Sequence, residues 1–235
     1  GEIMDFFEFG VPQTRHRFVL VGVRNDEKTD IDPVMFFELV SNDKKSFLKN
    51  KGLKAGLSIA DAISDLERKN GEKDSPDTNG FMAGVYGKPK SKFQRLMREE
   101  VSSDIPDSHR FANHKKEIED RFKTILKKGL NNKQIREKFN LKKLHTKKLD
   151  EGKPSPTLTT LPDDYIHYNE PRIMTVREYA RIQTFPDWFE FKGKYTTGGE
   201  RRVLEVPRYT QIGNAIPCLF GEQAGLALKE VRNLL

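Results

Sequence analysis

The chain has 235 residues, of which 35% are hydrophobic and 33% charged, and 42 Lys and Arg against 35 Asp and Glu give a net charge of +7. This length provides for one or two domains with a buried core, and no apolar stretch forms a signal peptide or approaches the ~20 residues of a membrane span. The single cysteine, Cys218, excludes an internal disulfide framework and a cysteine-built zinc site, so an intracellular protein is expected.

The positive charge is concentrated in one part of the chain. Residues 114–153 contain 14 Lys and Arg against 6 Asp and Glu, whereas the remaining residues are about neutral. A localised excess of this kind favours a polyanionic partner such as nucleic acid more than a diffusely basic surface would.

Residues 10–24 combine a turn, two closely spaced arginines (Arg15 and Arg17) and a largely apolar run that ends at Arg24. The first eight read Gly-Val-Pro-Gln-Thr-Arg-His-Arg, and the apolar run at 18–24 predicts a buried strand because it is continuous and rich in β-branched residues. Side chains alternate along an extended segment, so Arg15 and Arg17 are expected to share a face. Two solvated arginines leading into a strand are the alternative.

Between residues 25 and 151 the pattern is irregular, and short helices are predicted over 59–66, 91–101, 115–128 and 131–140. Ser58 and Asp61 form a capping box at the start of the first helix, and Gly129 ends the third. The polar, turn-rich stretch at 70–80 predicts a surface loop.

The most informative string lies at 172–187 and reads Arg-Ile-Met-Thr-Val-Arg-Glu-Tyr-Ala-Arg-Ile-Gln-Thr-Phe-Pro-Asp. Thr175 followed three residues later by Glu178 predicts a capping box, and Pro186 ends the helix after about three turns. Arg177 and Arg181 share one helical face. On spacing alone, an ordinary amphipathic helix with solvated arginines accounts for the pattern.

Two further segments flank this helix. Before it, residues 153–160 read Lys-Pro-Ser-Pro-Thr-Leu-Thr-Thr, and the two prolines fix the backbone on entry to the segment. After it, residues 201–207 are strand-like, and 208–217 contain the turn residues Gly213 and Asn214 ahead of a final amphipathic helix. The start of that helix presents free amides to a polar ligand.

These strings together resemble the DNA cytosine-5 methyltransferases. Residues 172–187 are similar to the ninth sequence block of that family, R-x-x-T-x-R-E-x-A-R-x-Q-x-F-P-D, and residues 10–17 to the eighth, G-x-P-Q-x-R-x-R. Residues 208–217 are similar to the tenth, which usually ends G-N-[AS]-V-P-P, with Cys218 in place of the second proline. Residues 153–160 resemble the Thr-Leu segment that closes the family's target-recognition region.

The resemblance implies roles for particular residues. Arg17 would reach the target cytosine, Arg15 would lie on the DNA backbone side with Gln13 beside it, and Thr157, followed by Leu158, would contact the phosphate next to the flipped nucleotide. The cofactor S-adenosylmethionine would contact the turn residues and one aromatic side chain: Asn214, Ala215, Ile216 and Phe185. Arginines of the intervening recognition region are candidates for reading guanine edges: Arg95, Arg98, Arg110, Arg121 and Arg136. No metal is implied.

Three blocks that the family uses for catalysis are absent from this sequence: a Pro-Cys-Gln block, a Glu-Asn-Val block and a Gly-rich loop after a strand. Methylation at carbon 5 needs a thiolate that adds to carbon 6 of a flipped base. The resemblance therefore implies the C-terminal half of an enzyme, inactive alone and dependent on an N-terminal polypeptide that carries the cysteine. A natural second subunit and a truncated fragment both fit.

The expected fold is α/β. A partial Rossmann-like sheet, with one strand plus the C-terminal helix, would occupy 1–26 and 208–235, and a smaller mixed α+β target-recognition domain would occupy 27–207. The expected function is transfer of a methyl group from S-adenosylmethionine to C5 of cytosine in a specific double-stranded DNA sequence. The setting would be a prokaryotic or phage cytoplasm, in a restriction-modification system. A non-catalytic DNA-binding or regulatory relative is the alternative.

Overall fold

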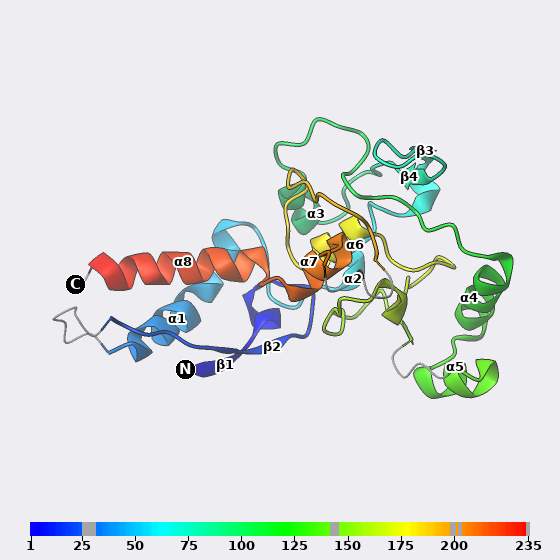
Figure 1. The fold of residues 1–235 in the computed structure, drawn as a ribbon. Coiled ribbons are helices and arrows are strands. Elements are labelled where there is room, and N and C mark those ends of the chain that lie inside the picture. Colours follow the sequence, from blue (N-terminus) through cyan, green and yellow to red (C-terminus); the bar gives the residue numbers. More distant parts are fainter. Residues whose placement is uncertain (25–31, 142–145, 198–200, 202–203, 234–235) are drawn as a thin grey trace.

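A computed structural model describes residues 1–24, 32–141, 146–197, 201 and 204–233 (Figure 1). Its strands are β1 (Glu2–Asp5), β2 (His16–Val19), β3 (Glu72–Asp74), β4 (Met82–Gly84), β5 (Lys147–Lys148) and β6 (Tyr165–Ile166). Its α-helices are α1 (Val34–Asn50), α2 (Ile59–Ile63), α3 (Lys92–Met97), α4 (Lys116–Lys128), α5 (Asn132–Phe139), α6 (Val176–Ile182), α7 (Arg208–Asn214) and α8 (Cys218–Asn233). Within these residues the strands form three two-stranded sheets, so the fold is mixed α/β with small sheets.

The N-terminal ribbon differs from the buried strand expected at 18–24. β1 and β2 pair antiparallel, and β2 ends at Val19. Ile3 and Phe18 are cross-strand partners, so they share a face, and they are 73% and 65% exposed. The expectation of a buried strand is wrong for the described residues because no other strand or helix among them covers this face, and no larger Rossmann-like sheet forms there.

The two ends of the chain and α1 share a hydrophobic cluster, here called the terminal cluster. Its buried members are Met4, Phe6, Phe9, Val11, Phe36, Phe37, Val40, Phe220 and Ala227. The rings of Phe6 and Phe220 stack with 4.3 Å between centroids. The sequence analysis missed α1, because the polar run at 41–46 interrupts its apolar spacing. α1 packs with the chain ends, although the boundary expected at residue 27 assigned it to the recognition domain.

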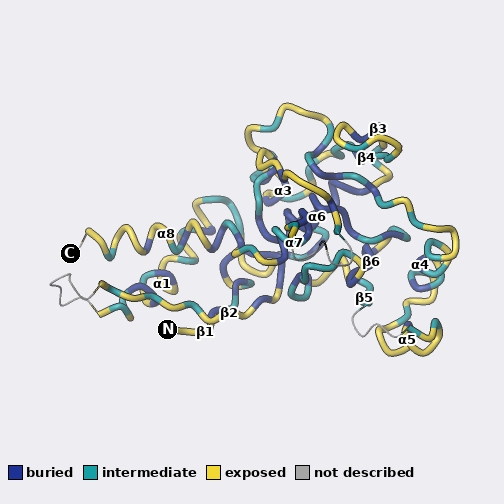
Figure 2. The backbone as a smooth tube through the Cα atoms, in the orientation of Figure 1, coloured by how far each residue is buried: buried dark blue, intermediate teal, exposed yellow. Residues whose placement is uncertain are grey.

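α6 lies in the centre of the larger part of the molecule, where the tube is mostly dark in Figure 2. The capping box of Thr175 and Glu178 is present, as are those of Ser58 with Asp61 and Asn131 with Gln134. The two predicted capping boxes, at Ser58 and Thr175, are confirmed, and the box at Asn131 is an additional finding at the start of the helix expected over 131–140.

α6 departs from the amphipathic pattern in one respect. Its arginines Arg177 and Arg181 are completely buried, so the interpretation of solvated arginines is wrong. The helix is enclosed on all sides by α2, α3, α7 and their connections (Figure 1). A charge can be buried in this way only if it is paired and hydrogen-bonded.

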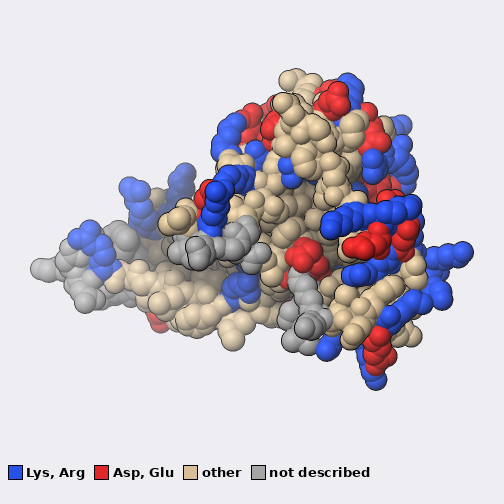
Figure 3. Space-filling model, turned by 45° about the vertical axis from the view of Figure 1, so that its right-hand side comes forward, with Lys and Arg blue, Asp and Glu red and all other residues tan. Residues whose placement is uncertain are grey.

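α4 and α5 form a helical hairpin at one edge of the molecule (Figure 1). The prediction that Gly129 ends the helix is confirmed, because this residue adopts a left-handed φ of +57° after Lys128. The hairpin has its own small apolar cluster of Phe122, Ile125 and Ile135 with Ile166. Lys and Arg side chains gather over this edge in Figure 3, which accounts for the charge concentration seen in the sequence.

Candidate DNA and cofactor site

Arg15 connects three segments that are far apart in the sequence. Its Nη2 donates to the carbonyl oxygens of Gly213 at 2.9 Å and Ala215 at 3.4 Å, and its Nη1 donates to the carbonyl of Leu158 and the side chain of Gln13, both at 3.3 Å. The residue is 3% exposed. One guanidinium therefore holds together the Gly10–Arg17 segment, the Thr-Leu segment and the end of α7.

Gln13 and Leu158 belong to the same buried junction. Gln13 Oε1 accepts from the backbone N–H of Leu158 at 3.0 Å, and its Nε2 donates to Gln183 at 3.2 Å. Both residues are buried. The expectation of direct DNA contacts by these side chains is corrected here, because their polar groups are already paired inside the protein and their surfaces are covered.

Arg15 and Arg17 do not share a face, contrary to expectation. β2 begins at His16, so Arg15 lies before the strand and the alternation of strand side chains does not extend to it. Arg17 is exposed, and its Nη1 donates to the carbonyl of His16 at 2.7 Å. Burial and the nearby charge of Arg17 lower the pKa of Arg15 to about 10, well above neutral pH. In this structure the side chain of Arg17 is accessible to a ligand, whereas that of Arg15 is buried and hydrogen-bonded to carbonyl groups of two other segments.

Thr157 lies beside this arginine pair. Its hydroxyl donates to the carbonyl of Thr14 at 2.8 Å, and the residue keeps part of its surface exposed. The adjoining segments pair through Gln13 and Ser155 as well, so the Thr-Leu segment lies alongside the Gly10–Arg17 segment. The sequence analysis assigned both segments to one site, and the structure brings them together.

The end of α6 is tied to the start of α8. Gln183 accepts at its carbonyl from the N–H of Cys218 at 3.2 Å, and the hydroxyl of Thr184 accepts from the N–H of Leu219 at 2.9 Å. Thr184 has a φ of +59°, a left-handed conformation that a threonine rarely adopts. The hydrogen bond to α8 maintains this strained backbone conformation. The chain changes direction at Thr184, so Phe185 does not continue the helix.

Phe185 lines a pocket of about 410 Å³ between the segment that follows α6, the end of α3 and the start of α8. Two neighbouring aromatic side chains, Trp188 and Phe189, line it as well, as do Glu99 and the ion pair of Glu222 with Lys51. Aromatic faces and carboxylates suit a ligand that combines a flat heterocycle with a positive charge. This chemistry fits S-adenosylmethionine, which contains an adenine and a sulfonium.

The other expected cofactor residues lie outside this pocket. Asn214 ends α7, and the prediction that Gly213 and Asn214 form a turn before the final helix is wrong, because both lie within α7. Asn214 and Ile216 are exposed, and Ala215 is half-buried. The connection from Ala215 to Pro217 follows, with α8 starting at Cys218. Asn214 and Ile216 are thus accessible, but Phe185 alone of the four lines the pocket.

Comparison with known proteins identifies the family. The family model for C-5 cytosine-specific DNA methylases matches residues 1–230. The chain belongs to this family. Among curated relatives, it is 28% identical over 235 residues to the Type II methyltransferase M.DdeI of Desulfomicrobium norvegicum, covering 94% of this chain and 51% of that protein. It is 41% identical over 87 residues to M.AquIB of Picosynechococcus, covering 36% of this chain and 62% of that protein.

A solved structure agrees with this family. The fold is similar to that of a DNA modification methyltransferase encoded within an Escherichia coli prophage, with a TM-score of 0.59 and 22% identity over 99% of this chain and 60% of that one. The chain spans about half the length of the curated relatives it matches. In the described residues of this methylase chain no helix is long and apolar enough to cross a membrane.

The methylase chain contains a buried ionic network that the sequence analysis did not find. Arg181 donates to both oxygens of Asp187 at 2.6 Å and to both oxygens of Asp65 at 3.2 Å, and all three residues are essentially unexposed. Arg177 donates to Asp107 at 2.9 Å and to the carbonyl of Phe189 at 2.7 Å. The ninth-block string drew attention to these two arginines. Sequence spacing could not predict Asp65 and Asp107 as their partners, because both lie in segments far from α6 in the chain.

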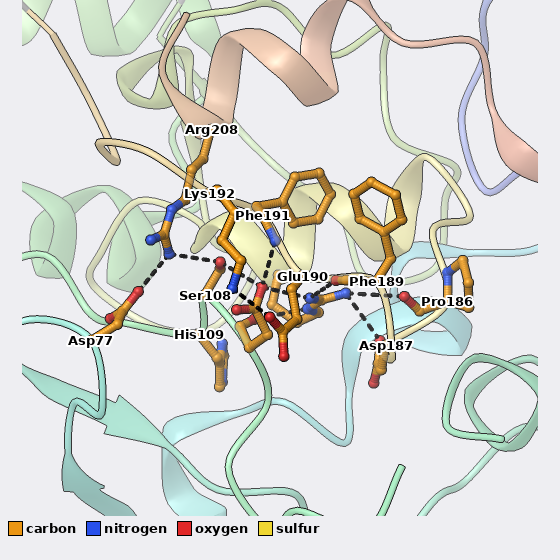
Figure 4. Close-up of polar contacts among 12 residues, drawn as sticks. Asp77, Ser108, His109, Pro186, Asp187, Phe189, Glu190, Phe191, Lys192 and Arg208 are labelled. Atoms are coloured by element: carbon orange, nitrogen blue, oxygen red, sulfur yellow. Dashed lines mark hydrogen bonds and ion pairs between the residues drawn. The ribbon is translucent and has the colours of Figure 1, made fainter. Parts of the chain in front are cut away.

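A second ionic contact lies beside this network. Arg208 donates to Asp77 at 2.5 Å and to the hydroxyl of Ser108 at 2.9 Å, and Figure 4 shows these three residues from separate elements meeting at one point. Arg208 hydrogen bonds and the neighbouring positive charge lower the pKa of Asp77, although its partial burial acts in the opposite direction. This contact ties α7 to the loop that follows β3.

The arginines expected to read bases differ in how they are held. Arg98 stacks on Tyr86, 4.1 Å from the ring centroid, and donates to the carbonyl of Gly87 at 2.7 Å. Arg95 and Arg136 are exposed, and Arg121 lies 5.5 Å from the ring of Phe139. Arg110 lies between two aromatic rings.

Proposed function

We propose that this chain is the DNA-recognition half of a DNA (cytosine-5) methyltransferase. The enzyme would transfer a methyl group from S-adenosylmethionine to C5 of cytosine in a specific duplex sequence, in a restriction-modification system. The observation that carries the proposal is the junction at Arg15, which joins the eighth-block, Thr-Leu and tenth-block segments of this family member at one point. Several relatives are Type II methyltransferases, which supports it.

In this proposal the chain's own residues hold the flipped cytosine and the DNA backbone. Arg17 is exposed at the edge of the junction and would donate hydrogen bonds to the base, while Arg15 supports it from inside. The hydroxyl and exposed surface of Thr157 would contact the phosphate beside the flipped nucleotide. Extrusion of the base costs a few kcal/mol, so contacts of this kind must compensate for it.

The cysteine nucleophile would come from a separate N-terminal polypeptide. The only cysteine of this chain, Cys218, is half-buried at the start of α8, and burial raises the pKa of its thiol to about 11. Because the thiolate is the reactive form, a thiol with a raised pKa is a poor nucleophile at neutral pH. Cys218 also lacks the Pro-Cys-Gln context of the family's catalytic block.

The cofactor would be shared between the two polypeptides. S-adenosylmethionine supplies the electrophilic methyl group when it is bound. On this chain, Phe185 and its aromatic neighbours would form one wall of its pocket, and the carboxylate of Glu99 would favour its positive charge. Asn214 and Ile216, exposed at the end of α7 and after it, would contact its edge.

Methyl transfer from labelled S-adenosylmethionine to double-stranded DNA tests the proposal directly. The chain alone should transfer no methyl group, and addition of a polypeptide that carries the Pro-Cys-Gln block should produce transfer. A Cys218→Ser variant should behave like the wild type in both conditions. Transfer by the chain alone that is lost in Cys218→Ser would identify Cys218 as the nucleophile and overturn the two-polypeptide proposal.

Arg17→Ala tests the base contact within the reconstituted enzyme. The variant should lower the rate of transfer by about 100-fold or more, because a charged hydrogen bond to the reacting base would be lost. Binding of S-adenosylmethionine, measured by calorimetry, should be unchanged. An equal loss of cofactor affinity would assign Arg17 a structural role in place of contact with the cytosine.

A further inference from the structure

We propose that Arg110 reads a guanine in the DNA recognition sequence. The inference rests on the proposed DNA-recognition function and goes further, since it selects one arginine from five that the sequence could not rank. A residue that reads a base must be held in a fixed orientation before DNA arrives, and its hydrogen-bond donors must still be available. Arg110 meets both conditions.

Two aromatic rings fix the orientation of the guanidinium. Its central carbon lies 4.0 Å from the ring centroid of Phe81 and 3.7 Å from that of Tyr195, so the planar group is held between them. The backbone of Arg110 is fixed as well, because it pairs with Ala83 of β4 in an isolated bridge. Stacking on both faces leaves only the edge of the guanidinium to interact with a ligand.

The donors of Arg110 have no partner among the residues that the structure describes. Its Nε is buried without a hydrogen bond, whereas its two terminal nitrogens are not buried. The nearest carboxylate, Asp77, is already bonded to Arg208 and to the hydroxyl of Tyr195. The two terminal nitrogens are therefore the donors that a ligand accepting at this edge could reach.

Arg98 provides the contrast. It also stacks on a ring, that of Tyr86, but its Nη1 donates to the carbonyl of Gly87 at 2.7 Å and lies 3.5 Å from Asp65. Its Nη1 is therefore paired within the protein and ties the side chain to the loop around Gly87. Arg95 is the opposite case, an exposed arginine on α3 with no ring beside it among the described residues. Only Arg110 of these three is both fixed and unpaired.

One pocket is lined both by a ring partner of Arg110 and by residues near the proposed DNA site. Tyr195, which stacks on Arg110, also lines a pocket of about 480 Å³. The opposite wall of that pocket is formed by Thr160 and Leu161, which directly follow the Thr-Leu segment beside Arg15. Thr210 of α7 completes it, and its hydroxyl together with that of Thr160 adds polar groups. The pocket thus places the ring of Tyr195 near the residues that directly follow the Thr-Leu segment.

The chemistry favours a guanine over a phosphate. Guanine presents two acceptors, O6 and N7, side by side in the major groove, and an arginine edge pairs with both at once. A phosphate accepts from any orientation, so it does not need a guanidinium held between two rings, and the exposed lysines of α4 and α5 already offer such contacts. Because two aromatic rings hold the guanidinium, Arg110 favours a planar partner whose acceptors lie in the plane of the guanidinium.

Selection from a randomised duplex library by this chain together with the N-terminal polypeptide tests the inference. Wild-type protein should enrich a sequence that contains guanine at one or more positions. Arg110→Gln should lose about tenfold of the preference for guanine at one position and keep the preferences elsewhere. Arg110→Lys, which keeps the charge but not the fork, should lose the same preference, and Phe81→Leu should weaken it.

Arg95→Gln is the matched control, because it removes the same charge from an arginine that no ring holds. It should lower affinity slightly for all sequences and leave the enriched sequence unchanged. An Arg110→Gln variant with unaltered preferences, or with an equal loss of affinity for every sequence, would overturn the base-reading role. A wild-type chain that enriches no sequence would instead refute the proposed DNA-recognition function, and Arg110 with it.

Discussion

The helix α6 and the β1–β2 ribbon both depart from the usual distribution of side chains. The helix buries charged side chains, whereas the ribbon exposes apolar ones. In α6, Arg177 and Arg181 are 0% exposed, whereas in the ribbon Ile3 and Phe18 are 73% and 65% exposed. The buried arginines are paired by carboxylates within the chain, so the buried charge of α6 is satisfied internally. The exposed apolar pair has no cover among the described residues.

This difference indicates how the two regions are stabilised. Every charge in the centre of α6 has a partner that this chain supplies. The helix therefore needs no second polypeptide to compensate its buried charges. The ribbon leaves an apolar face that is costly in water, and contiguous faces of this kind mark surfaces for association. On the proposed function, the N-terminal polypeptide covers it.

The largest expected effect comes from breaking the network of α6. Arg181→Met would leave the carboxylates of Asp65 and Asp187 buried without their shared counter-charge, and removal of one partner of a buried pair costs about 3–5 kcal/mol. Urea unfolding followed by circular dichroism should show this loss in free energy of unfolding. Arg95→Met, an exposed control, should change it by less than about 0.5 kcal/mol. A loss below about 1 kcal/mol in Arg181→Met would contradict the importance assigned to the network.

Acid should weaken the same region through a buried histidine. Burial lowers the pKa of His109 to about 4, below its unfolded value near 6.5, so the folded protein binds fewer protons than the unfolded chain between these values. The contribution to stability is complete above pH 6.5 and falls by roughly 3 kcal/mol as the pH drops towards 4. Burial also lowers the pKa of His167, to about 3, so this histidine should reduce the stability of the fold at acid pH in the same way.

Urea midpoints measured from pH 7 to pH 4 check this expectation. His109 contacts the hydroxyl of Thr175 and the carbonyl of Leu66, each at 2.8 Å, and an amide can occupy the same two positions. His109→Gln should therefore flatten the pH dependence, whereas His16→Gln, at an exposed histidine, should leave it unchanged. A pH profile that His109→Gln does not alter would show that another group causes the acid sensitivity.

The smallest effect on folding is expected in the ribbon. Phe18→Ser should change the free energy of unfolding of the chain by less than about 0.5 kcal/mol, because the side chain is largely in water already. It should nevertheless weaken association with the N-terminal polypeptide, measured by co-purification or calorimetry. The opposite outcome, a large loss of stability with unchanged association, would mean that the ribbon is a core element of this chain.

The sequence by itself determined the family and some of the local structure, although it did not reveal α1 or the helical conformation of Gly213 and Asn214. The strings at 10–17, 172–187 and 208–217 identified the relationship that the family comparison bears out. The capping boxes at Ser58, Asn131 and Thr175 and the helix end at Gly129 were also predictable, because each depends on hydrogen bonds between residues a few positions apart.

Only the tertiary structure decided which side chains remain available for function. Arg15 and Arg17 are two positions apart, yet one is buried against Gly213 and the other is exposed. Arg110 differs from Arg98 solely in the partners that distant segments bring to it. The local pattern cannot encode these differences, because burial and pairing arise from contacts between residues far apart in the chain.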